Sequence, residues 1–202
     1  IKWETTKQTD IGVDMSFFDK RLSLTADYYN KNTTDMLLFT RIDNYLGGGN
    51  LLQNIGSVNN RGFELLVDVL AVDGTDFKWS TSLNASLNKN KVVSLGEDEM
   101  IKMQQLGGGL INNPIQVIQT GESLGSFYLI PWEGIYQQDV DGHKAGENKY
   151  TDLSGNGTIG YEDMRIAGNA TPKVQWGFNN NFDYKNFQLN VFVQGAYGHQ
   201  LF

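Results

Sequence analysis

Residues 172–198, PKVQWGFNNNFDYKNFQLNVFVQGAYG, decide the fold class because they contain two runs in which apolar and polar residues alternate. The runs are residues 174–182 and 187–194. Side chains of a strand point to opposite faces at a period of two, so each run predicts a strand with one apolar and one polar face. Residues 183–186, DYKN, are rich in turn formers. The stretch therefore predicts an antiparallel hairpin.

The same pattern occurs twice more along the chain. Alternating runs flank short turns at residues 18–21 and 73–76, which predicts about six strands in all. Long connections, at about 33–54 and 89–171, separate the hairpins. Short turns at one end, long loops at the other and aromatic residues beside the turns are typical of an antiparallel transmembrane β-barrel, whose long loops are extracellular. Alternation alone leaves a soluble β-sandwich open, because its strands alternate too.

Composition and charge exclude some functions. The chain has 202 residues and a net charge of −7, which argues against a nucleic-acid partner because phosphate binding needs clustered Lys and Arg. It has no Cys, so disulfides and thiolate metal sites are excluded. No apolar run is long enough to predict a transmembrane helix. The sequence begins in the middle of an alternating pattern, from which we expect a piece of a longer polypeptide.

Seven short phrases, spread over nearly the whole chain, resemble one known family. They are residues 2–6 (KWETT), 54–64 (NIGSVNNRGFE), 77–81 (FKWST), 88–92 (NKNKV), 125–128 (GSFY), 133–137 (EGIYQ) and the stretch 152–168. In this order they are similar to the C-terminal half of SusC/RagA-type TonB-linked outer-membrane proteins. The resemblance implies a large barrel in the bacterial outer membrane, closed by a plug, that imports nutrients such as glycans or peptides.

The resemblance also implies partners and boundaries. It implies a Bacteroidetes-type bacterium, a SusD-like surface lipoprotein that acts as a lid, surrounding outer-membrane lipid, and energy delivered through TonB. The family's plug and TonB-contacting segment lie N-terminal to the similar region, so we expect residues 1–202 to be part of one barrel domain without the plug. No enzymatic activity is expected. The alternative function is that of a secreted, calcium-stabilised β-sandwich that binds carbohydrate.

Residues 152–163, DLSGNGTIGYED, have the spacing of a calcium-binding loop. Oxygen ligands at positions 1, 3 and 5, Gly at 6, a carbonyl at 7 and a carboxylate at 12 match such a loop, because Ca²⁺ takes six to eight oxygens. The candidate ligands are Asp152, Ser154, Asn156, Thr158 and Asp163. Two carboxylates predict a weak site, with a dissociation constant of about 10⁻⁴ to 10⁻³ M. The alternative is a Gly/Asx-rich turn that satisfies its own backbone.

Aromatic side chains in the long connections are candidates for contact with a substrate or partner. The four that we single out are Phe127, Tyr128, Trp132 and Tyr136. The resemblance places them at the outward mouth of the barrel, where rings could stack on sugars or hold a peptide. A connection of this length must also bury something to be ordered, so the rings could instead pack the connection against itself or against the lid.

Overall fold

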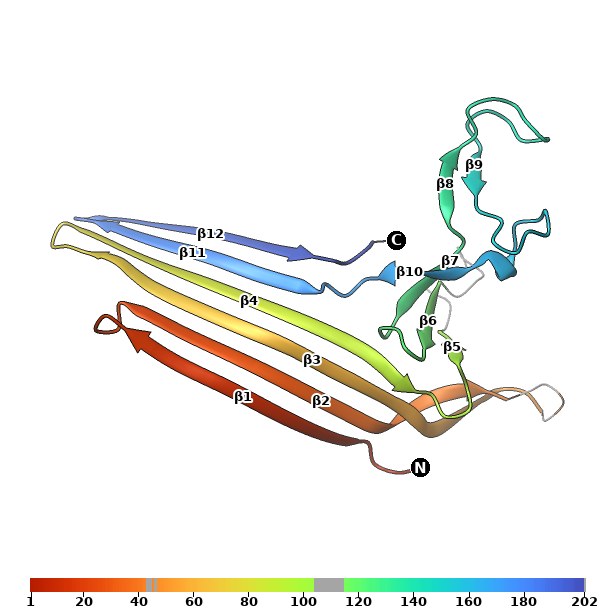
Figure 1. The fold of residues 1–202 in the computed structure, drawn as a ribbon, viewed down its shortest axis with the longest axis horizontal. Helices are drawn as coiled ribbons and strands as arrows, with labels where there is room; N and C mark the ends of the chain where they lie inside the picture. Colours follow the sequence, from red (N-terminus) through yellow and green to blue (C-terminus); the bar gives the residue numbers. More distant parts are fainter. Residues whose placement is uncertain (43–44, 46, 104–114, 202) are drawn as a thin grey trace.

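The computed structural model describes residues 1–42, 45, 47–103 and 115–201, and its main feature is a six-stranded antiparallel sheet. In sheet order, the strands are β1 (Thr5–Phe17), β2 (Leu22–Arg41), β3 (Asn50–Asp73), β4 (Phe77–Ser94), β11 (Val174–Tyr184) and β12 (Phe187–Tyr197). Figure 1 shows them side by side in one long layer, which we call the main sheet. The predicted all-β architecture of about six strands is confirmed.

The connections of the main sheet alternate between short and long. The turns β1–β2, β3–β4 and β11–β12 lie together at one end, and the connections β2–β3 and β4–β11 lie at the other (Figure 1). We call these the tight-turn end and the long-connection end. In transmembrane barrels the tight turns face the periplasm and the long connections face the outside.

The strand register gathers apolar side chains on one face of the main sheet, which we call the outer face. Its middle row runs across all six strands and consists of Met15, Leu24, Val67, Leu83, Phe178 and Val193. The adjacent row, on the opposite inner face, consists of Ser16, Ser23, Asp68, Ser82, Asn179 and Phe192. Among the described residues no second sheet covers the outer face, where Ile11 is 64% and Leu189 is 58% exposed. A soluble sandwich would bury this face under a second sheet, so the exposed apolar face favours the barrel.

Both long connections are shorter than predicted, because the strands continue beyond the alternating runs. The connection predicted at 33–54 is confined to residues 42–49, since β2 ends at Arg41 and β3 begins at Asn50. Register shifts between Thr33 and Leu37 break the period-two pattern while the strands stay paired. The connection predicted at 89–171 begins only after Ser94.

The connection between β4 and β11 contains β-structure of its own. Four of its strands form a small sheet in the order β10 (Arg165–Asn169), β7 (Ser126–Leu129), β6 (Gln116–Gln119) and β5 (Met100–Lys102). A separate pair consists of β8 (Trp132–Ile135) and β9 (Asn148–Tyr150). Residues 104–114 of this connection lie outside the described part. No helix in the described ranges has the length and apolar character needed to cross a membrane.

The buried core lies where the small sheet meets the long-connection end of the main sheet. Val58 of β3 and Val92 of β4 pack with Leu95 and with Ile118 of β6. The turn after β6 is hydrogen-bonded to β4, because the backbone N–H of Val92 donates to the carbonyl of Glu122 at 2.8 Å. The small sheet is therefore anchored to the inner side of the wall at the long-connection end.

Candidate functional site

The outer face carries an apolar band with aromatic residues at both ends. At the tight-turn end, the rings of Trp79 and Phe182 stack with their centroids 5.7 Å apart. At the other end, Tyr28 lies in the same outer-face row as Leu87. From Phe77 to Leu87, at about 3.3 Å per residue and a tilt of about 40°, the band extends about 25 Å along the membrane normal. This height matches the lipid-facing band of transmembrane barrels.

One amide side chain lies inside this band, and its oxygen is satisfied. Asn180 occupies an outer-face position between Phe178 and Phe182 and is 8% exposed. Its Oδ1 accepts a hydrogen bond from Nε1 of Trp79 at 3.1 Å. An unpaired polar group in hydrocarbon costs several kcal/mol, so this bond allows the band to include an amide.

The inner face is polar and acidic. Its carboxylates come from four of the six strands and include Asp10, Asp14, Asp27, Glu64, Asp68 and Asp183. Amide side chains bridge neighbouring strands, as where Nδ2 of Asn190 donates to Oδ1 of Asn179 at 2.8 Å. A polar inner wall opposite an apolar outer band is the arrangement of a barrel with a hydrated lumen.

The predicted calcium ligands lie together on one tight loop that is held by its own hydrogen bonds. Asp152 accepts the backbone N–H of Gly157 at 2.8 Å. Asp163 is 0% exposed and accepts the backbone N–H groups of Ser154 at 2.9 Å and Gly160 at 2.7 Å. These bonds lower the pKa of both carboxyls, with Gly157 as the main cause at Asp152 and Ser154 as the main cause at Asp163.

The remaining oxygens of this loop are also engaged. Oδ1 of Asn156 accepts from the backbone N–H of Thr158 at 2.8 Å and from its hydroxyl at 2.7 Å. The hydroxyl of Ser154 donates to Asp152 at 3.1 Å. Within the described ranges, no three acidic or histidine side chains are grouped to hold a metal ion. The donor set therefore fits calcium in kind, but its geometry favours the self-satisfied turn, and calcium binding stays a prediction.

The four predicted contact aromatics differ in how much surface they offer. Phe127 of β7 is only 6% exposed, so it offers little surface, and its role as a contact stays a prediction. Tyr128, beside it in β7, is half-buried. Tyr136 is stacked on the ring of His143, with centroids 4.4 Å apart. Trp132 is 62% exposed and is the aromatic of the four with most surface available for contact.

Trp132 lies on a hairpin, residues 132–150, that stands away from both sheets (Figure 1). Nε1 of Trp132 donates to Oδ1 of Asn148 at 3.2 Å, across the strand pair. Glu133 and Lys149 form an ion pair at 2.9 Å, and their hydrogen bond lowers the pKa of Glu133 and raises that of Lys149. These contacts hold the projecting hairpin in shape.

Comparison with known proteins agrees with this barrel-wall geometry. A family model described as "TonB dependent receptor-like, beta-barrel" matches residues 1–198. The chain belongs to the TonB-dependent receptor family. Membership confirms the predicted resemblance and places the chain in the bacterial outer membrane.

Two curated relatives show how much of such a receptor this chain represents. The TonB-dependent receptor P3 of Formosa agariphila is 37% identical over 211 residues, which cover 100% of this chain and 21% of the relative. The TonB-dependent receptor SusC of Bacteroides thetaiotaomicron is 30% identical over 204 residues, which cover 97% of this chain and 20% of the relative. The chain thus spans about a fifth of the length of these relatives. Both are receptors, in agreement with the prediction that the chain is not an enzyme.

Solved structures confirm the fold. The RagAB peptide transporter superposes with a TM-score of 0.77 at 22% identity, over 98% of this chain and 22% of that chain. The RagAB peptide importer in the "open-open" state gives a TM-score of 0.79, again at 22% identity, over 98% of this chain and 21% of that chain. The main sheet of this TonB-dependent receptor is therefore a segment of antiparallel barrel wall.

Sequence reasoning missed one group of exposed residues, the cations Lys7, Arg61, Lys89 and Lys91 of the outer face. Lys89 and Lys91 follow Leu87 at a period of two, and this spacing could have indicated that all three side chains lie on the same face of the strand. Their neighbours on other strands are known only from the register.

Proposed function

We propose that this chain forms part of the wall of an outer-membrane receptor that imports a nutrient, a glycan or a peptide, with energy supplied through TonB. The family match over residues 1–198 carries the proposal. The apolar outer band and polar inner face support it, because a lipid-facing wall around a hydrated lumen is what uptake through the outer membrane requires.

The proposal includes partners at both ends of the receptor. A SusD-like surface lipoprotein covers the long-connection end, and TonB acts on a part of the receptor outside these residues. The acidic inner face supports a neutral or cationic nutrient and no nucleic acid, because phosphates would be repelled there. Solved neighbours described as a peptide transporter support a peptide as one of the two nutrient classes.

The projecting hairpin 132–150 is our proposed contact with the nutrient or the lipoprotein. Its exposed Trp132 offers a large, amphipathic ring, the kind of side chain that dominates binding at interfaces. Tyr136 supports the hairpin from within, through its stacking on His143.

Uptake by a deletion strain tests the proposed function. The strain lacking the gene is supplied with an oligosaccharide mixture or a peptide mixture as sole carbon source, and depletion of each from the medium is measured. We expect one class to be lost, to return with the complete gene, and to be blocked by a protonophore. Unchanged depletion of both classes, or rescue that is insensitive to the protonophore, contradicts the proposal.

A further inference from the structure

The outer face becomes basic immediately beyond the apolar band, towards the long-connection end. The first row past the band consists of Thr9, Asn30, Arg61 and Lys89, and the next row on this face consists of Lys7, Asn32, Asn59 and Lys91. Two adjacent rows over four adjacent strands thus carry four cationic side chains, which we call the basic rows.

The outer face has no acidic side chain to balance the basic rows. Every outer-face position of the six strands, from the tight turns to the row of Lys7, is apolar, neutral or basic. From the tight turns to the row of Lys7, the acidic side chains of these strands lie on the inner face, and the chain as a whole has a net charge of −7. The outer face of the sheet is therefore basic although the chain as a whole is acidic.

The four cations are available to a ligand. Lys7, Arg61, Lys89 and Lys91 are all exposed, and none takes part in the ion pairs found within the described ranges. The inner-face Lys31 lies at the same level of the sheet, between Gln8 and Asn60.

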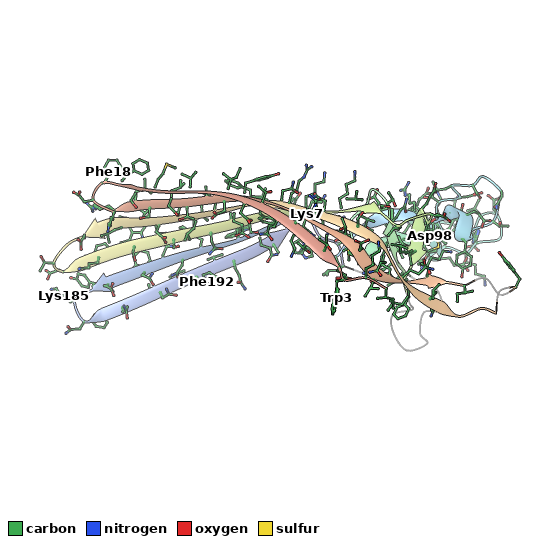
Figure 2. The ribbon with its side chains drawn as sticks, turned by 90° about the horizontal axis from the view of Figure 1, so that it is seen from below. Trp3, Lys7, Phe18, Asp98, Lys185 and Phe192 are labelled. Atoms are coloured by element: carbon green, nitrogen blue, oxygen red, sulfur yellow. The ribbon has the colours of Figure 1, made fainter. Side chains whose placement is uncertain are left out.

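The basic rows lie at the level of the lipid headgroups. Lys89 is two residues beyond Leu87, about 7 Å along the strand and about 5 Å further out along the membrane normal. The headgroup region of a bilayer occupies about 5–8 Å on each side of the hydrocarbon core. Figure 2 shows Lys7 part-way between Phe18 and Lys185 at the tight-turn end and Asp98 at the other, as expected for a residue at this boundary.

A recess adjoins the basic rows, at the point where β4 leaves β11. Backbone pairing of the two strands ends with the bond from Asn88 N–H to Lys173 carbonyl at 3.0 Å, and further on β4 pairs with the turn after β6. The cavity there has a volume of about 670 Å³, and its lining includes Arg61, Phe63, Leu87, Lys89, Lys173 and one carboxylate residue, Glu122. Four of these residues belong to outer-face rows, while Asn90 and Ser126, which also line the cavity, belong to the inner face and to the small sheet.

We propose that Lys7, Arg61, Lys89 and Lys91 bind the phosphate groups of lipid headgroups in the outer leaflet. Arg and Lys form charge-assisted hydrogen bonds with phosphate, and their stems can lie along the adjoining apolar surface. The occupant is a phosphorylated lipid rather than a soluble anion, because the basic rows continue without a break into the band on which acyl chains would lie. The inference rests on the outer-membrane location and goes beyond nutrient import.

Binding of a defined lipid to the full-length receptor in detergent tests the inference. The probe is diphosphoryl lipid A in dodecyl maltoside micelles, titrated onto immobilised receptor, with fully dephosphorylated lipid A and inorganic phosphate as separate arms. A charge near an anionic lipid surface contributes about fivefold in affinity, so we expect Arg61→Gln with Lys89→Gln to weaken binding about 25-fold. Lys31→Gln removes the same charge from the inner face at the same level and is expected to leave affinity unchanged.

Each other outcome overturns the inference. Two of these outcomes concern the variants: an affinity of the double variant within twofold of wild type, or an equal loss of affinity in Lys31→Gln. The other two concern the probes: dephosphorylated lipid A that binds as tightly as the phosphorylated form, or inorganic phosphate that binds as tightly as the lipid. Heat-modifiable migration on gels verifies that each variant barrel is folded, and Lys7→Gln with Lys91→Gln repeats the test if the first pair is not. This assay measures lipid binding and no transport, so a negative result would overturn the lipid-binding inference without bearing on nutrient import.

Discussion

Val67→Arg tests which face of the main sheet meets lipid. Val67 lies in the middle outer-face row, paired with Leu24 and Leu83. It is four residues from Phe63 in the boundary row, about 13 Å along the strand and about 10 Å in depth, so it lies near the middle of a band about 25 Å high. Arg on the lipid face costs about 2–4 kcal/mol at the midplane and about 0–1 kcal/mol near the interface. We expect these two losses in the free energy of unfolding for Val67→Arg and Phe63→Arg, respectively.

The assay is equilibrium unfolding by guanidinium of the full-length receptor in phosphatidylcholine vesicles, followed by Trp fluorescence. The matched control is Leu66→Arg, which places the same side chain on the inner face of the same strand and is expected to cost less than about 1 kcal/mol. A larger loss for Leu66→Arg than for Val67→Arg, or equal losses for Val67→Arg and Phe63→Arg, would refute the lipid-facing assignment.

Four further predictions concern the loops and the wall. If the loop 152–163 binds Ca²⁺, terbium luminescence of the full-length receptor should show a site with a dissociation constant of about 10⁻⁴ to 10⁻³ M. Asp163→Asn should abolish this signal, and the control Asp141→Asn should not. A signal that Asp163→Asn leaves unchanged would exclude this loop as the site. The pKa values of Asp152 and Asp163 are lowered, so their hydrogen bonds stabilise the loop fully above the usual pKa of 3.8 and less as the pH falls below it. Hydrogen-exchange protection of the loop, corrected for the intrinsic exchange rate, should therefore decrease below about pH 4. Protection that stays constant down to pH 2 would contradict this prediction. Gly62→Ala should lower the free energy of unfolding by about 1–3 kcal/mol, because the added Cβ would lie 2.5 Å from the carbonyl oxygen of Leu87 and against the hydroxyl of Tyr29. An unchanged free energy of unfolding would mean that β3 and β4 can separate at this point. Trp132→Ala should leave stability within about 0.5 kcal/mol and weaken nutrient or lipoprotein binding at least about tenfold; unchanged binding excludes its ring as a contact.

Local alternation was sufficient to predict the wall of the barrel. Val174, Trp176 and Phe178 were placed on one face by their spacing, and the register puts them in the same rows as Leu87, Ala85 and Leu83 of β4. The period of two is a property of one strand, so it can be read without knowing the partner strand. The tight turns were found for the same reason, because turn-forming residues act within a few positions.

Features that depend on distant pairing were not predictable. The extension of β2 was missed because Asp35, at φ 56°, interrupts the alternation while pairing with β3 resumes beyond it. The small sheet pairs β10 with β7, whose sequence separation carries no local signal. The loop 152–163 illustrates a third limit. Its spacing indicated a tight loop that carries both carboxylates, but it did not show that backbone N–H groups donate hydrogen bonds to Asp152 and Asp163.

Accessibility of single spin labels along β3 shows whether the outer face of this sheet contacts lipid. The chain has no Cys, so a label can be attached at one chosen position between residues 63 and 69 of the full-length receptor in vesicles, once any Cys elsewhere in the receptor is replaced. Collision with oxygen, which concentrates in lipid, and with a water-soluble nickel chelate is measured at each position. Labels at 63, 65, 67 and 69 are expected to collide mainly with oxygen, and those at 64, 66 and 68 with the chelate. Accessibility that does not alternate, or alternates in the opposite phase, would contradict this expectation.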